Sequence, residues 1–267
     1  MNLLTRMMAF LSFFVMVQNV NAAGNSVYVD QIGDGSTINI TQTGNSNSLG
    51  SANSKATFNG NNNTINIEQI GNSNVTNTVI NGTGVFVTKI ITGNSNTTEL
   101  NCGANGGSCS GSTITNTVTG NGNTLIQNHD GLTFSNININ SDNNTVNLTN
   151  TSTAIAGAKT TVDISGGNGN TVDITQSGTA GIAGHETDLT IVGATNTVDI
   201  RQGGTVDSKV VTTVTGSGNN ITKLFPNSST VEVKSVPRTE TVAVGVLSLI
   251  FCLSIFPFCP VAKRTVP

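Results

Sequence analysis

Aromatic and charged side chains are scarce in this sequence. The 267 residues include no Trp, one Tyr and only 9% charged residues, and the formal net charge is -3. Binding to nucleic acid requires clustered Lys and Arg, whereas the 11 Lys and Arg here are scattered, so we expect no nucleic-acid partner. Asn and Thr instead make up nearly a third of the chain. Because Asn, Thr and Gly are poor helix formers while Val, Ile and Thr favour strands, the composition predicts an all-β protein.

Side chains that could perform catalysis are also few. The two histidines, His129 and His185, lie in loop-like sequence without a second His nearby, and we expect both to be exposed. Asp173 and Asp199 occupy the same place in successive repeats and could pair two carboxylates, as in a β-helical glycosidase. Alternation places them outward, which favours a solvated polar ladder. We therefore expect no catalytic, cofactor-binding or metal site, and no enzyme activity.

The first 22 residues have the pattern of a secretory signal peptide. Arg6 precedes an apolar core from Met7 to Val17, and the small Ala22 precedes Ala23. Removal of residues 1–22 would leave a mature chain that begins at Ala23. The signal predicts export into an oxidising compartment.

Residues 236–267 form a second apolar segment, with a basic end. The stretch from Val242 to Ala262 is long enough to cross a membrane as a helix, and Lys263 and Arg264 follow it. The Val236-Pro237 pair upstream, the apolar span and the basic tail together resemble an exosortase-type sorting signal. The segment is equally compatible with a plain membrane tether or with a terminal strand pair that caps the core.

The four cysteines fall into two pairs. Cys102 and Cys109 flank a short Gly-rich segment, and in an exported protein this spacing predicts a disulfide that closes a small loop. Cys252 and Cys259 lie within the apolar tail, where we expect them to act as small hydrophobic residues or as lipid attachment points.

Between these segments a Gly-x-x-Asn turn recurs and leads each time into a short strand that alternates apolar and polar residues. The mean spacing of the turns is about 25 residues. A unit of this size cannot bury its apolar face alone, but stacked copies form a continuous core. We therefore predict that residues 23–235 form a β-solenoid of about eight stacked two-strand rungs. The eight turns end at Asn47, Asn74, Asn96, Asn123, Asn144, Asn170, Asn196 and Asn219, and Ser141 takes the place of the Gly in the turn that ends at Asn144.

Five of the strands continue into a Gln-x-Gly sequence. Period-two alternation places this Gln on the core side, where an unsatisfied amide would cost about 1–3 kcal/mol. Equivalent amides on stacked rungs can bond to one another as a ladder. We therefore assign a structural ladder role to the following Gln and turn Asn residues: Gln31, Gln42, Gln69, Gln176, Gln202, Asn47, Asn74, Asn170 and Asn196.

Two segments carry a family resemblance. Gln31-x-Gly33-x-x-Ser36-x-Ile38-x3-Gln42 and Asn63-x-Ile65-x3-Gln69-x-Gly71-x-x-Asn74 follow the spacing of the curlin repeat, which reads approximately Ser-x5-Gln-x-Gly-x-x-Asn-x-Ala-x3-Gln. The chain resembles this family, the subunits of curli-type functional amyloid, over residues 26–76 and partly over 166–204. Between residues 97 and 165 most Gln positions are lost, and the sequence does not predict the rung register there.

The resemblance implies an extracellular, self-assembling fibre subunit at the surface of a Gram-negative bacterium. Such a subunit would contribute to cell adhesion and to a biofilm matrix, and its expected partners are other copies of itself and a nucleator or secretion machinery. The alternative is a monomeric, membrane-anchored β-solenoid adhesin that binds glycan or another cell. Concentration-dependent growth distinguishes the two, because only the fibre subunit polymerises.

Overall fold

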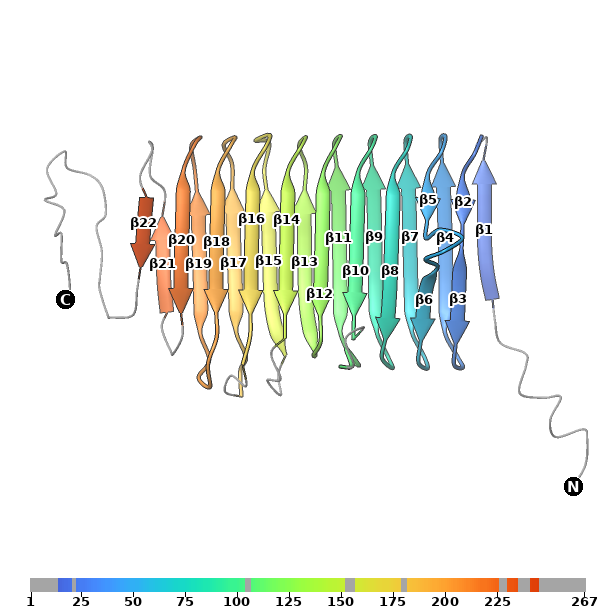
Figure 1. Ribbon diagram of the computed structural model, residues 1–267, viewed down its shortest axis with the longest axis horizontal. Helices are drawn as coiled ribbons and strands as arrows, with labels where there is room; N and C mark the ends of the chain where they lie inside the picture. Colours follow the sequence, from blue (N-terminus) through green and yellow to red (C-terminus); the bar gives the residue numbers. More distant parts are fainter. Residues whose placement is uncertain are drawn as a thin grey trace, which may run out of the picture.

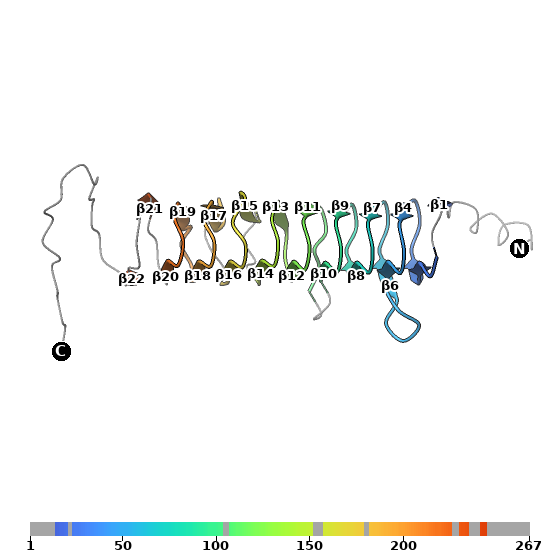
Figure 2. The same ribbon diagram turned by 90° about the horizontal axis from the view of Figure 1, so that it is seen from above.

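The computed structural model describes residues 14–20, 23–103, 107–151, 157–178, 182–225, 230–234 and 241–244, and it describes side chains within 23–222 of these ranges. The prediction of an all-β solenoid with a repeat near 25 residues is confirmed. The described residues contain no helix, and thus none long and apolar enough to cross a membrane. Figure 1 shows the strands side by side along the long axis of the molecule, and Figure 2 shows that they form two layers.

The first layer is a ten-stranded parallel sheet. Its strands, in spatial order, are β1 (Phe14–Val20), β4 (Thr37–Thr43), β7 (Thr64–Ile70), β9 (Phe86–Thr92), β11 (Thr113–Thr119), β13 (Thr133–Ile139), β15 (Ala158–Ile164), β17 (Glu186–Ile191), β19 (Lys209–Val214) and β21 (Thr230–Lys234).

The second layer is a twelve-stranded sheet, and its pairings are also parallel. Ten of its strands follow one path: β2 (Ser26–Val27), β5 (Ser48–Leu49), β8 (Val75–Asn81), β10 (Thr97–Cys102), β12 (Thr124–His129), β14 (Thr145–Asn150), β16 (Thr171–Gln176), β18 (Thr197–Gln202), β20 (Asn220–Phe225) and β22 (Thr241–Val244). Two more lie off this path: β3 (Val29–Ile32) pairs with β6 (Ala56–Asn59), which in turn pairs with β8.

The chain alternates between the two sheets, so each strand pairs with a strand one full turn further along. Register partners are equivalent residues of successive repeats: Ile38 pairs with Ile65, and Ile65 pairs with Val87. The stack stays in parallel register through residues 97–165, where the sequence did not predict it. The loop between β5 and β6 leaves the second sheet and projects outward (Figure 2).

Alternating residues of each strand face the space between the sheets, and this interior is the core. The apolar core forms two separate clusters rather than one. The first extends from Ile38 to Ile114, and the second begins at Ile91 and Val118 and extends to Ile221. Buried polar side chains lie between the two clusters, and they form the middle of the candidate site.

Both terminal segments contribute a described strand. β1 lies within the predicted signal peptide and pairs with β4, with Phe14 opposite Thr37 and Val20 opposite Thr43. β22 lies within the predicted C-terminal segment and pairs with β20. The signal peptide and the C-terminal anchor or sorting segment stay predictions, and Cys252 and Cys259 lie outside the described residues.

Candidate functional site

The most regular interior feature is a ladder of buried asparagines at the Gly-x-x-Asn turns. Asn74 donates to Oδ1 of Asn47 from its backbone N at 3.1 Å and from its Nδ2 at 3.0 Å. Asn96 repeats the same pair of bonds to Asn74. Nδ2 of these residues also donates to a glycine carbonyl one turn away, as Asn47 does to Gly71 at 2.7 Å. Every polar atom of the amide thus has a defined role in the stack. The bonds continue through Asn123, Asn144, Asn170, Asn196 and Asn219.

Glutamines form two shorter ladders. Nε2 of Gln42 donates to Oε1 of Gln69 at 2.6 Å, and the two are register partners. Gln176 and Gln202 are likewise partners, joined at 3.2 Å. All four side chains are buried. These ladders lie on different sheets, since Gln42 and Gln69 belong to the first sheet and Gln176 and Gln202 to the second.

Gln31 does not belong to either ladder, and its assignment as a ladder amide is wrong. Its strand β3 lies in the second sheet, where its register partner is Phe58. Its Nε2 donates to the carbonyl of Gly33 in its own turn at 3.2 Å. The physical reason is the loop between β5 and β6, after which β6 supplies an aromatic residue at the stacked position.

Buried polar residues also lie in the core between the two glutamine ladders, in what we call the interior polar band. Gln69 donates to Thr76 at 2.9 Å, and Thr76 bonds to Thr98 at 3.0 Å. Further along, Asn116 donates to Gln127 at 2.6 Å, which donates to Ser135 at 3.1 Å. The band consists of Thr76, Thr98, Lys89, Asn116, Gln127 and Ser135, all buried.

The residues of this band lie outside the Gln-x-Gly positions, so that motif does not identify them. A usable signal was present. In β9 the inward positions are Val87, Lys89 and Ile91, and in β11 they are Ile114, Asn116 and Val118. In these two strands a polar residue between two inward aliphatic residues identifies Lys89 and Asn116 once the phase of the strand is known.

Among the side chains that the structure describes, Lys89 and His129 are the two buried ionisable groups with perturbed pKa values. Lys89 is only 1% exposed, and burial lowers its pKa from 10.5 to about 7, an effect that the nearby Glu99 carboxylate opposes. Burial lowers the pKa of His129 from 6.5 to about 3, and the positive charge of Lys89 adds to this shift. Neither the Nζ of Lys89 nor either ring nitrogen of His129 has a hydrogen-bond partner.

The expectation that both histidines are exposed is therefore wrong. His129 is the last residue of β12 and follows the inward positions Leu125 and Gln127 into the core. His185 is 0% exposed, and its ring nitrogens lie 2.8 Å from Ser208 Oγ and 2.8 Å from the carbonyl oxygen of Ser177. The turn-like sequence around the two histidines favoured exposed loops. Parallel stacking instead buries His129 at the end of β12 and His185 directly before β17.

The buried imidazole of His129 makes the fold sensitive to acid. Below pH 6.5 the unfolded chain binds a proton at this residue, whereas the folded chain does not until the pH approaches 3. The free energy of unfolding therefore falls with decreasing pH across this window, by roughly 5 kcal/mol for this group. Urea unfolding of wild type and His129→Gln at several pH values measures the effect. We expect a shallower fall in the variant, and equal slopes would contradict the assignment.

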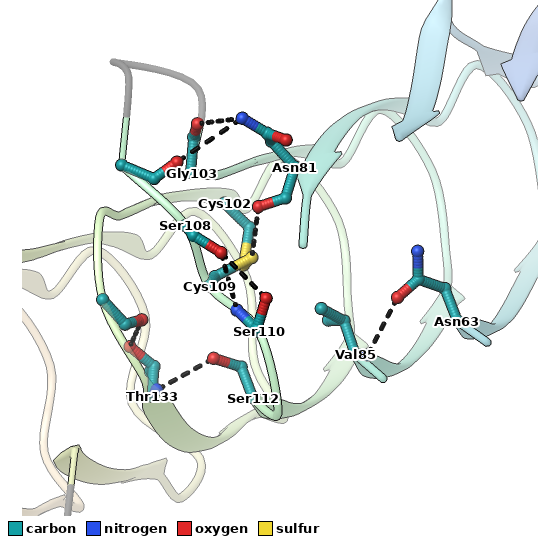
Figure 3. Close-up of a disulfide and its surroundings, with 12 residues drawn as sticks. Asn63, Asn81, Val85, Cys102, Gly103, Ser108, Cys109, Ser110, Ser112 and Thr133 are labelled. Carbon is teal, nitrogen blue, oxygen red and sulfur yellow. Dashed lines mark hydrogen bonds between the residues drawn. A yellow bond between two sulfur atoms is a disulfide. The ribbon is translucent and has the colours of Figure 1, made fainter. Parts of the chain in front are cut away.

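A disulfide joins Cys102 at the end of β10 to Cys109, with a Cα–Cα distance of 5.5 Å (Figure 3). The described ends of the loop that it closes contact the preceding turn. Asn81 Nδ2 donates to the carbonyl of Gly103 at 3.2 Å, and the backbone N of Cys109 donates to the Asn81 carbonyl at 3.2 Å. The disulfide thus closes an insertion between β10 and β11, and the parallel register of β10 and β12 is not interrupted.

Outward-facing carboxylates stack where the sequence analysis expected them. Asp173 and Asp199 are register partners on the outer face of the second sheet. Asn147 donates to Asp173 at 2.6 Å, and the guanidinium of Arg201 binds Asp199 at 3.0 Å. Each carboxylate thus has its own partner, which limits the repulsion between stacked like charges. In the part of the chain that the structure describes, no three metal-ligating side chains lie together.

Comparisons of the chain with protein-family models, with curated proteins and with solved structures gave no match.

Proposed function

We propose that this chain is a structural subunit of an extracellular, curli-like amyloid fibre that contributes to cell adhesion and to a biofilm matrix. The observation that carries the proposal is the parallel, in-register stack of amide ladders, which is the arrangement by which separate chains join in cross-β fibres. In such a fibre the stack within one molecule continues into the next. Self-association is then the main interaction of the chain, with a nucleator or secretion machinery as additional partners.

The N-terminal end of the solenoid has the features of a growing end. Oε1 of Gln42 is buried and has no hydrogen-bond partner among the described residues, so the glutamine ladder ends in an acceptor. On the N-terminal side of β4, the only strand of the first sheet is β1. If the predicted signal peptide is removed after Ala22, β1 is removed with it. An unpaired strand edge and an unfilled amide acceptor would then face solvent, and both favour addition of another chain.

The alternative is a monomeric, membrane-anchored adhesin, and one observation favours it. With both terminal segments present, β1 covers β4 and β22 covers β20. Covered edges oppose end-to-end growth. In this alternative the exposed Asn and Thr residues of the faces bind glycan or another cell, and the C-terminal segment tethers the chain.

The amide at the growing end provides a test of the fibre proposal. We expect Gln42→Leu, introduced into residues 23–235, to slow concentration-dependent fibre growth at least several-fold, because the variant cannot accept a bond from the next chain. The matched control is Gln127→Leu, which removes an equally buried amide from the middle of the stack. Thioflavin fluorescence at several concentrations gives the growth rate. Equal slowing in both variants would show that the end amide has no special role, and absence of growth in the parent would favour the adhesin.

A further inference from the structure

Lys89 and Asn116 lie next to each other in the core, at the point where the apolar core is interrupted. They are register partners on β9 and β11, and each is 1% exposed. Val87 and Ile114 on one side belong to one apolar cluster, while Ile91 and Val118 on the other side belong to the second. The pair therefore occupies the boundary between the two clusters.

The polar atoms of this pair are incompletely bonded. Nζ of Lys89 has no hydrogen-bond partner, and neither has Oδ1 of Asn116. Nδ2 of Asn116 donates to Oε1 of Gln127 at 2.6 Å, which fixes the orientation of the amide. A buried, unbonded amine beside a buried, unbonded carbonyl is unfavourable, because both groups have lost their water. Neighbouring strands are about 4.8 Å apart, so a lysine side chain readily spans the distance to the side-chain carbonyl of its register partner.

We propose that Nζ of Lys89 and Cγ of Asn116 become joined by an isopeptide bond that links two consecutive turns of the solenoid. The neutral amine attacks Cγ, and a new C–N bond forms as the bond from Cγ to Nδ2 breaks. The proton lost by the amine leaves with Nδ2, which departs as ammonia. No oxidant, reductant or other reactant is consumed, and the chain becomes lighter by about 17 Da.

The surroundings favour this reaction in three ways. Burial holds the Lys89 pKa near 7, so the nucleophilic neutral amine is well populated. The fold places the two residues side by side on neighbouring strands, which replaces a bimolecular encounter by an intramolecular one. The titratable groups within electrostatic range are Glu99 on β10, which stabilises the ammonium form, and His129 on β12, whose imidazole stays neutral. The product is a neutral amide, so the bond removes a buried amine from the core.

The link would join residues 27 positions apart in the sequence and would connect turns across the gap in the apolar core. The nearby Cys102–Cys109 disulfide closes a loop within one turn and does not join turns. The isopeptide bond is therefore the only covalent connection between turns that we infer in the described residues. The inference does not depend on polymerisation, since the two residues belong to one chain.

Mass spectrometry of the purified, denatured full chain tests the proposal directly. After allowance for the disulfide and for any signal-peptide removal, we expect a mass lower than the sequence mass by one ammonia. Without the link, trypsin separates the two residues into peptides 56–89 and 90–159, whereas the link should block cleavage after Lys89 and leave one internally cross-linked peptide of residues 56–159 that is lighter by one ammonia. Ring closure at an Asn-Gly sequence loses the same mass, but it leaves the Lys89 amine free and trypsin still cleaves after Lys89. A full-mass chain, or the mass loss with a free Lys89 amine, would overturn the proposal.

Substitutions show whether the link uses Lys89 and Asn116 or involves another lysine. Lys89→Met and Asn116→Ala should each restore the full mass, whereas Lys159→Met, which changes an exposed lysine on β15, should keep the loss. The wild-type spectrum decides the question even if a core variant fails to fold. Retention of the link in Asn116→Ala would also contradict the assignment.

Discussion

Asn123→Leu is expected to lower the free energy of unfolding by about 2–4 kcal/mol. Asn123 lies in the middle of the buried asparagine ladder. Its Nδ2 donates to Asn96 Oδ1 at 3.1 Å, and its own Oδ1 accepts bonds from the backbone N and the Nδ2 of Asn144 at 2.9 and 3.3 Å. Leucine has a similar size but makes none of these bonds. The variant therefore leaves polar groups of both neighbouring turns without partners in a site that excludes water.

Urea unfolding followed by circular dichroism measures this loss. The matched control is Asn128→Leu in the same strand region, because Asn128 faces outward and is only partly buried. We expect the control to change the free energy of unfolding by no more than about 0.5 kcal/mol, as is usual for surface positions. If both variants were equally stable, the ladder would not be a main source of stability.

Gly93→Ala is expected to have a still larger effect, a loss of more than about 3 kcal/mol or failure to fold. Gly93 has a φ of +122°, which residues with a side chain rarely adopt. In addition, an alanine Cβ at this position would overlap the backbone carbonyl of Gly120 in the next turn. The neighbouring backbone cannot move aside without breaking the stack. Gly44 and Gly71 occupy equivalent places and approach the next turn in the same way.

Gly84→Ala is the control for Gly93→Ala. Its φ of +66° is also left-handed, but no atom lies within 4 Å of the alanine Cβ. The expected loss is only about 1–2 kcal/mol, from backbone conformation alone. Thermal unfolding of the two variants separates the backbone cost from the clash. Equal melting temperatures of the two variants would mean that the close approach of successive turns does not explain why glycine is required at position 93.

The fold could be predicted because its signals are local and repeated. Period-two alternation identifies the strands, and the recurring turn gives the repeat and the positions of the ladder asparagines. These features depend on spacing within the sequence rather than on contacts between distant segments. The in-register pairing of Ile38 with Ile65 follows once the turns are aligned.

The errors arose where the position of a side chain depends on a neighbouring turn or on strand phase. Gln31 has the correct motif, but the loop before β6 places Phe58 beside it. In β12 two apolar residues, Leu125 and Ile126, adjoin each other, so alternation alone does not show whether His129 faces inward. Lys89 is a core residue because its register partners Ile67 and Asn116 are buried, and the sequence alone does not show this, since lysine is rarely buried.

The most direct test of the account is X-ray fibre diffraction from residues 23–235, purified without β1 and β22 and incubated at several concentrations. If the solenoid stack continues between molecules, growth accelerates with concentration and the fibres give reflections near ~4.7 and ~10 Å. The first reflection should lie along the fibre axis, because the strands are perpendicular to the direction of stacking. A soluble, β-rich monomer that shows no growth at any concentration would contradict the fibre proposal and would leave the anchored adhesin as the better explanation.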